Sequence, residues 1–227
     1  MKVAVMQPYF LPYLGYFQLV NKVDIFVFLD DVNFIKRGWI NRNRILVNGN
    51  SNLITIPLVG ASQNKLINEI EVLDDPIWKK KLLTKIEHAY SKSSNFNIVF
   101  PLVQDLILSN YKLISDYAMA SVERVSEYIG VKTDFVISSE KFSDIAGGGE
   151  SRIIDICKEL GADTYFNMAG GKELYDSKRF MEKGINLVFV EPKLEPYDQV
   201  NFDGFEPGLS IMDLLFNVNK EDLFAHL

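Results

Sequence analysis

Two adjacent carboxylates near the start of the chain have the residue types and the position needed for acid–base chemistry. Asp30 and Asp31 directly follow a short apolar run. A carboxylate placed there can act as a general base, or it can hold a hydroxyl, an ammonium or Mg²⁺. The alternative is a turn in which one carboxylate caps a helix or a loop. Successive residues of a strand point to opposite faces, so we expect only one of the two to face a ligand.

A group of cationic side chains follows the two carboxylates. Its members are Lys36, Arg37, Arg42 and Arg44. The planar fork of arginine matches phosphate oxygens, which favours a pair of phosphates as the target. Trp39 could stack on a base or a sugar, and Asn41 adds a hydrogen-bonding group. The alternative is a solvated charged face, with Trp39 buried in the core.

Two glycine-containing turns are further candidates for anion binding. The first, at residues 147–149, matches neither the dinucleotide nor the P-loop fingerprint, and Glu150 beside it would repel an anion. A turn with Ser151 as a helix cap is therefore favoured there. The second turn contains Gly170, Gly171 and Lys172, and its charge is more suitable. These three residues are kept as candidate substrate-binding residues.

The composition limits the classes of function. A formal net charge of −6 argues against a protein that coats nucleic acid, and no sequence-specific contact with nucleic acid is expected. One cysteine and two widely separated histidines predict neither a disulfide nor a metal site. The first apolar run is too short for a signal peptide, and no stretch approaches the roughly 20 apolar residues of a membrane helix. We therefore expect a cytoplasmic protein with no membrane insertion.

The elements that must position these groups can be predicted from the hydrophobic pattern. Residues 3–6 and 25–29 are continuous apolar runs, which is typical of strands covered on both faces. A helix is predicted between them, from residue 13 to about residue 21. A strand, a short helix and a strand at this spacing indicate a βαβ unit with a right-handed crossover.

In such sheets, ligands bind beyond the carboxyl ends of the strands. Gln7 and Tyr9 follow the first predicted strand, and Asp30 and Asp31 follow the second. We therefore expect all four residues at one edge of the sheet. Tyr9 lies between two prolines and is the aromatic residue of this stretch most suited to face a cleft.

The rest of the chain predicts one α/β domain over residues 1–227, with a mainly parallel sheet flanked by helices. A β-hairpin is expected around Asn48-Gly49, followed by a loop at residues 57–62. A helical insertion occupies about residues 75–130, with breaks at Pro101 and near residue 109. A helical tail covers about residues 205–227. The remaining strands are expected at residues 133–138, 163–167 and 185–190, and the helices between them at 151–160 and 174–183.

Several segments together resemble the WbqC-like family of bacteria. They are Met6-Gln7-Pro8-Tyr9-Phe10 and the strings at residues 12–17, 23–24 with 30–32, 36–44, 151–152 with 160–165, and 209–217. The resemblance spans nearly the whole chain. At residues 167–171 the chain departs from the expected Ser-Gly-Pro-Gly-Gly type of turn, which affects the identity of the substrate more than the fold.

The resemblance implies a role in surface-polysaccharide (O-antigen, lipopolysaccharide) biosynthesis, as a transferase that moves glycine or a similar acyl group to an amino sugar. On this hypothesis Asp30 or Asp31 deprotonates the ammonium of a nucleotide-linked amino sugar. The substrate-binding residues would be Gln7, Tyr9, Lys36, Arg37, Trp39, Asn41 and Arg42, with Lys36, Arg37 and Arg42 on the diphosphate. A carrier thioester and an aminoacyl-tRNA are both compatible acyl donors, which makes an acyl-carrier protein or a tRNA the expected partner.

Two other functions remain open at this point. The protein could hold a nucleotide sugar, or a partner enzyme, without catalysing a reaction. It could also transfer a nucleotidyl group, because the opening strand, turn and helix resemble nucleotidylyltransferases of the HIGH type. Gln7 and its neighbours offer no imidazole, which makes nucleotidyl transfer the weaker hypothesis.

Overall fold

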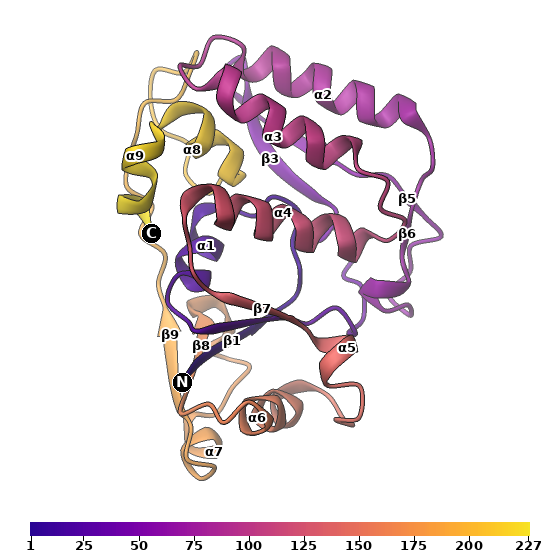
Figure 1. The fold of residues 1–227 in the computed structure, drawn as a ribbon, viewed down its shortest axis with the longest axis vertical. Coiled ribbons are helices and arrows are strands. Elements are labelled where there is room, and N and C mark those ends of the chain that lie inside the picture. The colour runs from indigo at the N-terminus through magenta and orange to yellow at the C-terminus, as the bar shows by residue number, and fades with distance from the viewer.

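The computed structural model describes residues 1–227, and a five-stranded parallel sheet lies at its centre (Figure 1). The strands are β1 (Lys2–Met6), β2 (Ile25–Phe28), β7 (Asp134–Ile137), β8 (Thr164–Met168) and β9 (Asn186–Val190). They lie in the order β7-β2-β1-β8-β9, and every neighbouring pair is parallel. Counted along the sheet this order is 3-2-1-4-5, so the direction in which strands are added reverses between β1 and β8. The predicted α/β class is confirmed.

Both faces of the sheet are covered by helices, which explains why its strands are continuously apolar. Helix α1 (Leu14–Val20) lies on one face, and its seven residues are all buried. Helices α6 (Gly149–Glu159) and α7 (Ser177–Met181) lie on the other face (Figure 1). Alternate residues of β2 accordingly belong to different cores: Phe26 packs in the cluster that includes α1, and Val27 in the cluster that includes α6.

Three helices between β2 and β7 form a layer above the sheet in Figure 1. They are α2 (Pro76–Tyr90), α3 (Phe96–Leu108) and α4 (Ile114–Ile129). The carboxylate of Asp75 accepts a hydrogen bond of 2.8 Å from the backbone N–H of Ile77, which begins α2. The predicted break at Pro101 is wrong. The ring of Pro101 lies on the exposed side of α3, while Val99 and Val103 stay buried on the inner side, so burial on both sides of the proline keeps the helix continuous.

The predicted hairpin is present and is formed by β3 (Arg42–Val47) and β4 (Asn50–Thr55). Asn48 and Gly49 both have positive φ, 50° and 71°, as a two-residue type I′ turn requires. A second pair of strands, β5 (Leu58–Val59) and β6 (Glu71–Val72), includes residues where only a loop was predicted. Two-residue strands are too short for an alternating pattern to reveal them. The 3₁₀ turn η1 (Ile67–Glu69) lies between them.

The predicted C-terminal tail contains short helices, which lie against the helical layer. They are α8 (Ile211–Asn217), α9 (Lys220–Leu223) and η3 (Phe224–His226). Asp213 of α8 is 1% exposed, and its carboxylate accepts hydrogen bonds from Tyr90 Oη (3.0 Å), Tyr197 Oη (2.9 Å) and Gln199 Nε2 (2.6 Å). Burial raises the pKa of this carboxyl group. These hydrogen bonds hold α8 against α2 and against the segment that precedes α8.

Some predicted boundaries differ from the structure. Helix α6 begins at Gly149, so Ser151 lies inside the helix and does not cap it; its hydroxyl donates to the carbonyl of Gly148 (3.1 Å). Helix α7 is shorter than predicted. Two short elements follow the strands: α5 (Ser138–Lys141) after β7, and η2 (Ala169–Gly171) after β8. None of the helices combines the length and the apolar character that are needed to cross a bilayer.

Candidate functional site

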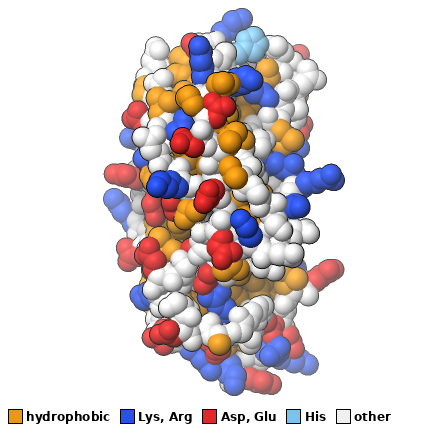
Figure 2. All heavy atoms as spheres, turned by 90° about the vertical axis from the view of Figure 1, so that its right-hand side faces the viewer, with side chains coloured by type: hydrophobic (Ala, Val, Ile, Leu, Met, Phe, Trp, Pro, Cys, Tyr) orange, Lys and Arg blue, Asp and Glu red, His pale blue; other side chains and the backbone are white.

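Polar side chains gather where the strands of the sheet end. Met6, Phe28 and Ile137 are in register, so the residues that follow them lie side by side at the carboxyl edge. Helix α5, which follows β7, lies on the right-hand side of Figure 1, and Figure 2 views the molecule from that side. Basic and acidic side chains are interspersed over this face. In doubly wound sheets the ligand lies at this edge, where the strand order reverses, and here that point is between β1 and β8.

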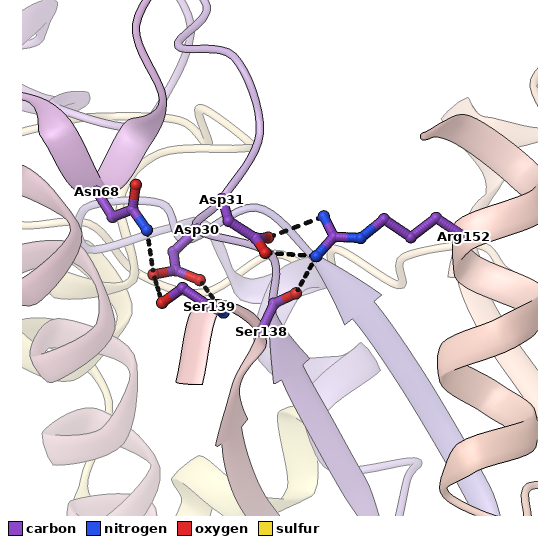
Figure 3. Close-up of polar contacts among 6 residues, drawn as sticks. All are labelled: Asp30, Asp31, Asn68, Ser138, Ser139 and Arg152. Atoms are coloured by element: carbon purple, nitrogen blue, oxygen red, sulfur yellow. Dashed lines mark hydrogen bonds and ion pairs between the residues drawn. The ribbon is translucent and has the colours of Figure 1, made fainter. Parts of the chain in front are cut away.

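Asp30 is held inside the protein by three hydrogen bonds. It is 2% exposed. Its carboxylate accepts from the hydroxyl and the backbone N–H of Ser139 (2.6 and 3.0 Å) and from Asn68 Nδ2 (3.2 Å) (Figure 3). Ser139 lies in the first turn of α5, so Asp30 caps a helix that is distant in sequence. These contacts agree with the capping alternative, while a catalytic role for Asp30 stays a prediction.

Asp31 points the other way and pairs with Arg152 of α6 (Figure 3). The guanidinium donates from both terminal nitrogens, Nη1 to Oδ1 at 3.0 Å and Nη2 to Oδ2, and Nη2 also donates to Ser138 Oγ at 3.3 Å. The side chains of Arg152 and Asp31 are only 8% and 13% exposed. The opposite directions of Asp30 and Asp31 follow from the alternation of side chains along an extended chain.

Arg152 is the main site residue that the sequence interpretation did not assign a role. A signal for it exists, because this cation directly precedes Ile153 and Ile154, which are both buried, in a helix that begins at the last of three consecutive glycines. A charged residue on the buried side of a helix needs a partner of opposite charge. Asn68, Ser138 and Ser139 carry no comparable signal, because polar residues of their types are common at turns and helix ends.

The cationic segment, which is residues 36–44, lies beside the turn that follows β1. The backbone N–H of Phe10 donates to the carbonyl of Trp39 (3.1 Å), and Asn43 Nδ2 donates to the carbonyl of Leu11 (2.7 Å). Trp39 is 39% exposed, so the alternative in which it is a core residue is wrong. The guanidinium carbons of Arg42 and Arg44 lie 6.0 and 5.8 Å from its ring centroid.

The members of the cationic segment differ in how much of each side chain remains available. Lys36 and Arg37 are exposed. Arg42 donates from Nε to the carbonyl of Gly38 (3.0 Å) and from Nη2 to the carbonyl of Arg37, so it closes its own loop. Asn41 Nδ2 donates to the carbonyl of Ile56 (2.8 Å). Lys36 and Arg37 are therefore the cations most available to a ligand.

Gln7 and Tyr9 lie in the turn that follows β1. Both are half-buried. The carbonyl of Gln7 accepts from Tyr16 Oη (2.9 Å), and the ring of Tyr9 packs against that of Tyr16 with centroids 5.7 Å apart. Burial raises the pKa of Tyr9.

The turn that follows β8 contains the remaining predicted residues. Gly170 and Gly171 lie in η2. A Cβ added to Gly171 would lie 2.9 Å from Asn167 Nδ2, so the absence of a side chain allows this close approach. The ammonium of Lys172 pairs with Glu191 (2.8 Å) at the end of β9, and this hydrogen bond lowers the pKa of Glu191. Binding of an anion by Lys172 stays a prediction.

Three cavities of the molecule are lined by other residues, one of them by Glu191, the partner of Lys172. Cavities of about 450, 1060 and 410 Å³ have none of the predicted site residues in their walls. No group of three or more His, Cys, Asp or Glu side chains is arranged to hold a metal ion.

Comparisons with known proteins agree with the resemblance seen in the sequence. A family model described as "WbqC-like protein family" matches residues 7–224. A protein of Mycobacterium tuberculosis, named "Uncharacterized protein Rv1507c", is 30% identical over 223 residues, which are 97% of this chain and 95% of that protein. No solved structure matches the chain.

Proposed function

Because the chain belongs to the WbqC-like protein family, we propose that it is an enzyme of bacterial surface-polysaccharide (O-antigen) biosynthesis. On this proposal it transfers an acyl or aminoacyl group, such as glycyl, to the amine of a nucleotide-linked amino sugar. One observation carries the proposal. A fixed carboxylate, Asp31, lies at the carboxyl edge of a sheet ordered 3-2-1-4-5, and exposed cations lie next to the turn that follows the central strand.

Asp31 has more acceptor positions free for this chemistry than Asp30. Asp30 is 2% exposed and receives three hydrogen bonds from the protein. Asp31 accepts two hydrogen bonds from one guanidinium, and a carboxylate has about four acceptor positions. It can therefore still accept a proton or hold an ammonium. Arg152 would act as a positioning residue that fixes the direction of this carboxylate.

The reaction needs a carboxylate because an ammonium has no lone pair with which to attack. Asp31 takes one proton from the sugar ammonium, and the free amine then forms a bond to the acyl carbon. The bond from that carbon to the donor's sulfur or oxygen breaks, and the leaving thiol or alcohol receives a second proton from the nitrogen. Asp31 then returns its proton to solvent.

The nucleotide would be held by the cationic segment. Lys36 and Arg37 are exposed and could face the two phosphates. Trp39 offers an exposed ring for stacking on the base, and Gln7 lies near enough to the end of β1 to orient the sugar. Arg42 would support this segment by closing its loop.

The test is an acylation assay with purified protein. Nucleotide-linked amino sugars are incubated with acyl-carrier thioesters and, separately, with aminoacyl-tRNA, and products are read by mass spectrometry. We expect one acyl addition per sugar, and a rate at least about 100-fold lower for Asp31→Asn, since a general base contributes on the order of 10²–10⁴. Asp155→Asn, which removes an exposed carboxylate of α6, is the matched control and should keep the wild-type rate. Folded wild-type protein that forms no acylated product with any pair would refute the proposal.

A second candidate function is nucleotidyl transfer, which the strand order favours. The order 3-2-1-4-5 is that of sheets that bind nucleotides at the reversal point. This function predicts Mg²⁺-dependent release of pyrophosphate when a nucleoside triphosphate and a sugar phosphate are supplied. Thermal stabilisation by nucleotide sugars, with neither acyl transfer nor pyrophosphate release, would instead identify a binding protein.

A further inference from the structure

Strand β9 forms one border of the central sheet, and its outer edge is unpaired. It is the last strand in the sheet order, and no other element lies beyond it at the left of Figure 1. The backbone N–H of Asn186 donates towards β8, to the carbonyl of Asp163 (2.8 Å). In a parallel pair, alternate residues turn both backbone groups to the neighbouring strand, so the N–H and C=O of Leu187 and of Phe189 point outward. Outside the ladder between β8 and β9, no backbone hydrogen bond uses these groups.

This edge has none of the features that normally keep a sheet from pairing with another chain. Such features are charged residues, proline or a very short strand. The sequence of β9 is Asn-Leu-Val-Phe-Val, with neither a charge nor a proline. The opposite edge strand, β7, is shorter and begins with the exposed carboxylate of Asp134. Val188 and Phe189 are half-buried and belong to neither core cluster, so β9 presents apolar side chains as well as free backbone groups.

The space beside this edge is open and its charges are mixed. A cavity of about 450 Å³ is bordered by Val188 and Phe189 together with residues of α1 and of the C-terminal segment. Its charged lining contains both signs, from Lys22, Lys193, Glu191 and Glu195. The interface of a twofold dimer must be complementary to itself, and a surface with both signs meets that need better than a surface with one sign.

Strand β9 is also complementary to itself in backbone and side chains. It spans Asn186–Val190, and its outward groups lie symmetrically on either side of its central residue, Val188. A twofold axis at Val188 would place Leu187 opposite Phe189 of an antiparallel second copy, and the four N–H···O bonds between the strands would use every outward group. The facing side chains would be Val188 with Val188 and Leu187 with Phe189. Cross-strand pairs of this apolar kind stabilise a sheet.

We propose that the chain forms a twofold dimer through β9, in which the five-stranded sheet continues into a second copy of the same chain. Because the two β9 strands are antiparallel, the carboxyl edges of the two copies point in opposite directions. Each candidate site therefore stays on its own copy, and the dimer depends on no step of the acylation proposal.

The first measurement is the mass in solution. Light scattering on the purified full chain at increasing protein concentration should give a mass that approaches twice the 25.9 kDa of one chain. A mass that stays at the value of one chain would overturn the proposal.

Cysteine cross-linking then tests the position of the axis. The only natural cysteine, Cys157, is buried, so an introduced cysteine is the reactive one. Directly opposed residues that do not bond each other have Cα atoms about 4.5 Å apart, which is within the range of a disulfide. Under mild oxidation, Val188→Cys should form a covalent dimer at least about tenfold faster than Asn186→Cys, whose counterpart in the second copy is Val190. Equal rates, or a faster reaction of the more exposed Asn186→Cys, would contradict an axis at Val188.

Opposite charges at the axis give an independent test. Val188→Lys alone and Val188→Glu alone would each place like charges against each other, so both proteins should have the mass of one chain, and mixing them should restore the dimer. Ile98→Lys adds the same charge at a 61% exposed position of α3 and should leave the wild-type mass unchanged. Circular dichroism confirms that each variant is folded, and the cysteine comparison decides the matter if a charged variant is not. A dimer of Val188→Lys alone, or a mixture of folded variants that stays monomeric, would show that β9 does not hold the two copies together.

Discussion

Replacing Arg152 by methionine tests whether its ion pair with Asp31 holds the carboxyl edge of the sheet together. Methionine keeps much of the apolar stem of arginine, so the packing of α6 against the sheet should change little. The guanidinium, however, disappears from a site where the side chains of Arg152 and Asp31 are only 8% and 13% exposed. Asp31 then remains as a charge with little access to water, and Ser138 loses a donor.

The size of the effect follows from that burial. Removing one partner of a buried pair costs about 3–5 kcal/mol, because the remaining charge is left uncompensated. Asp31 keeps some contact with solvent, so we expect the lower end, about 3 kcal/mol. For a chain of this length, 1 kcal/mol corresponds to about 2–4 °C in Tm, which predicts a loss of roughly 6–12 °C.

Denaturant unfolding followed by circular dichroism measures this loss. The double variant Asp31→Asn/Arg152→Met should be much less destabilised than the sum of the two single variants, with a coupling free energy of about 2 kcal/mol or more. Lys172→Met is the control, because Lys172 pairs with Glu191 and both side chains are well exposed, at 53% and 73%; this change should leave the free energy of unfolding nearly unaltered. If Arg152→Met behaves like this control, or if the single effects simply add, the buried pair does not stabilise the edge.

Three further outcomes can be checked on the same protein. Because burial raises the pKa of Asp213 above the ordinary value of an aspartate, the stability it contributes is present below that ordinary value and is lost as pH rises through the folded-state pKa. Urea unfolding at about pH 4 and pH 7 gives the difference in free energy of unfolding between the wild-type protein and Asp213→Asn. The advantage of the wild type should be smaller at pH 7, and an equal difference at the two pH values would contradict this. Burial raises the pKa of Cys157 to about 12, so its thiol should react with a disulfide reagent far more slowly in the native protein than in urea; rapid native labelling would count against the packing described. A Cβ at Gly15 would lie 2.5 Å from the ring of Tyr13, so Gly15→Ala should cost about 1–3 kcal/mol, whereas Gly148→Ala, with open space around it, should differ little from wild type by thermal unfolding.

The sheet could be predicted because its signals are local. A run such as residues 25–28 is apolar without interruption, and a strand buried on both faces needs nothing else to be recognised. Asn48-Gly49 likewise predicts a turn without help from distant residues, since both residues tolerate positive φ. Pro101 misled the prediction because its local effect on a helix was outweighed by burial of its neighbours in the tertiary structure.

The candidate site could be predicted only in part. That Asp30 and Asp31 end a strand, and that their side chains diverge, follows from chain geometry. Which protein groups meet them does not, because Ser139 and Arg152 are 109 and 121 residues away from their respective partners. The structure thereby separates two neighbouring carboxylates into a helix cap and one half of an ion pair.

The sequence by itself determined the class of the fold, the family, and the edge of the sheet at which the reactive groups lie, because hydrophobic period, turn chemistry and motif order are properties of neighbouring residues. The tertiary structure decided which of those groups remain available: Arg42 bonds the carbonyls of its own loop, Lys172 pairs with Glu191, and Lys36 and Arg37 stay exposed. It also created a cavity of about 1060 Å³ whose walls, from residues 71–79 and 110–117, meet only after the chain has folded. The physical reason is that hydrogen bonds, ion pairs and cavities depend on distances through space, and those distances exist only once burial has brought remote segments together.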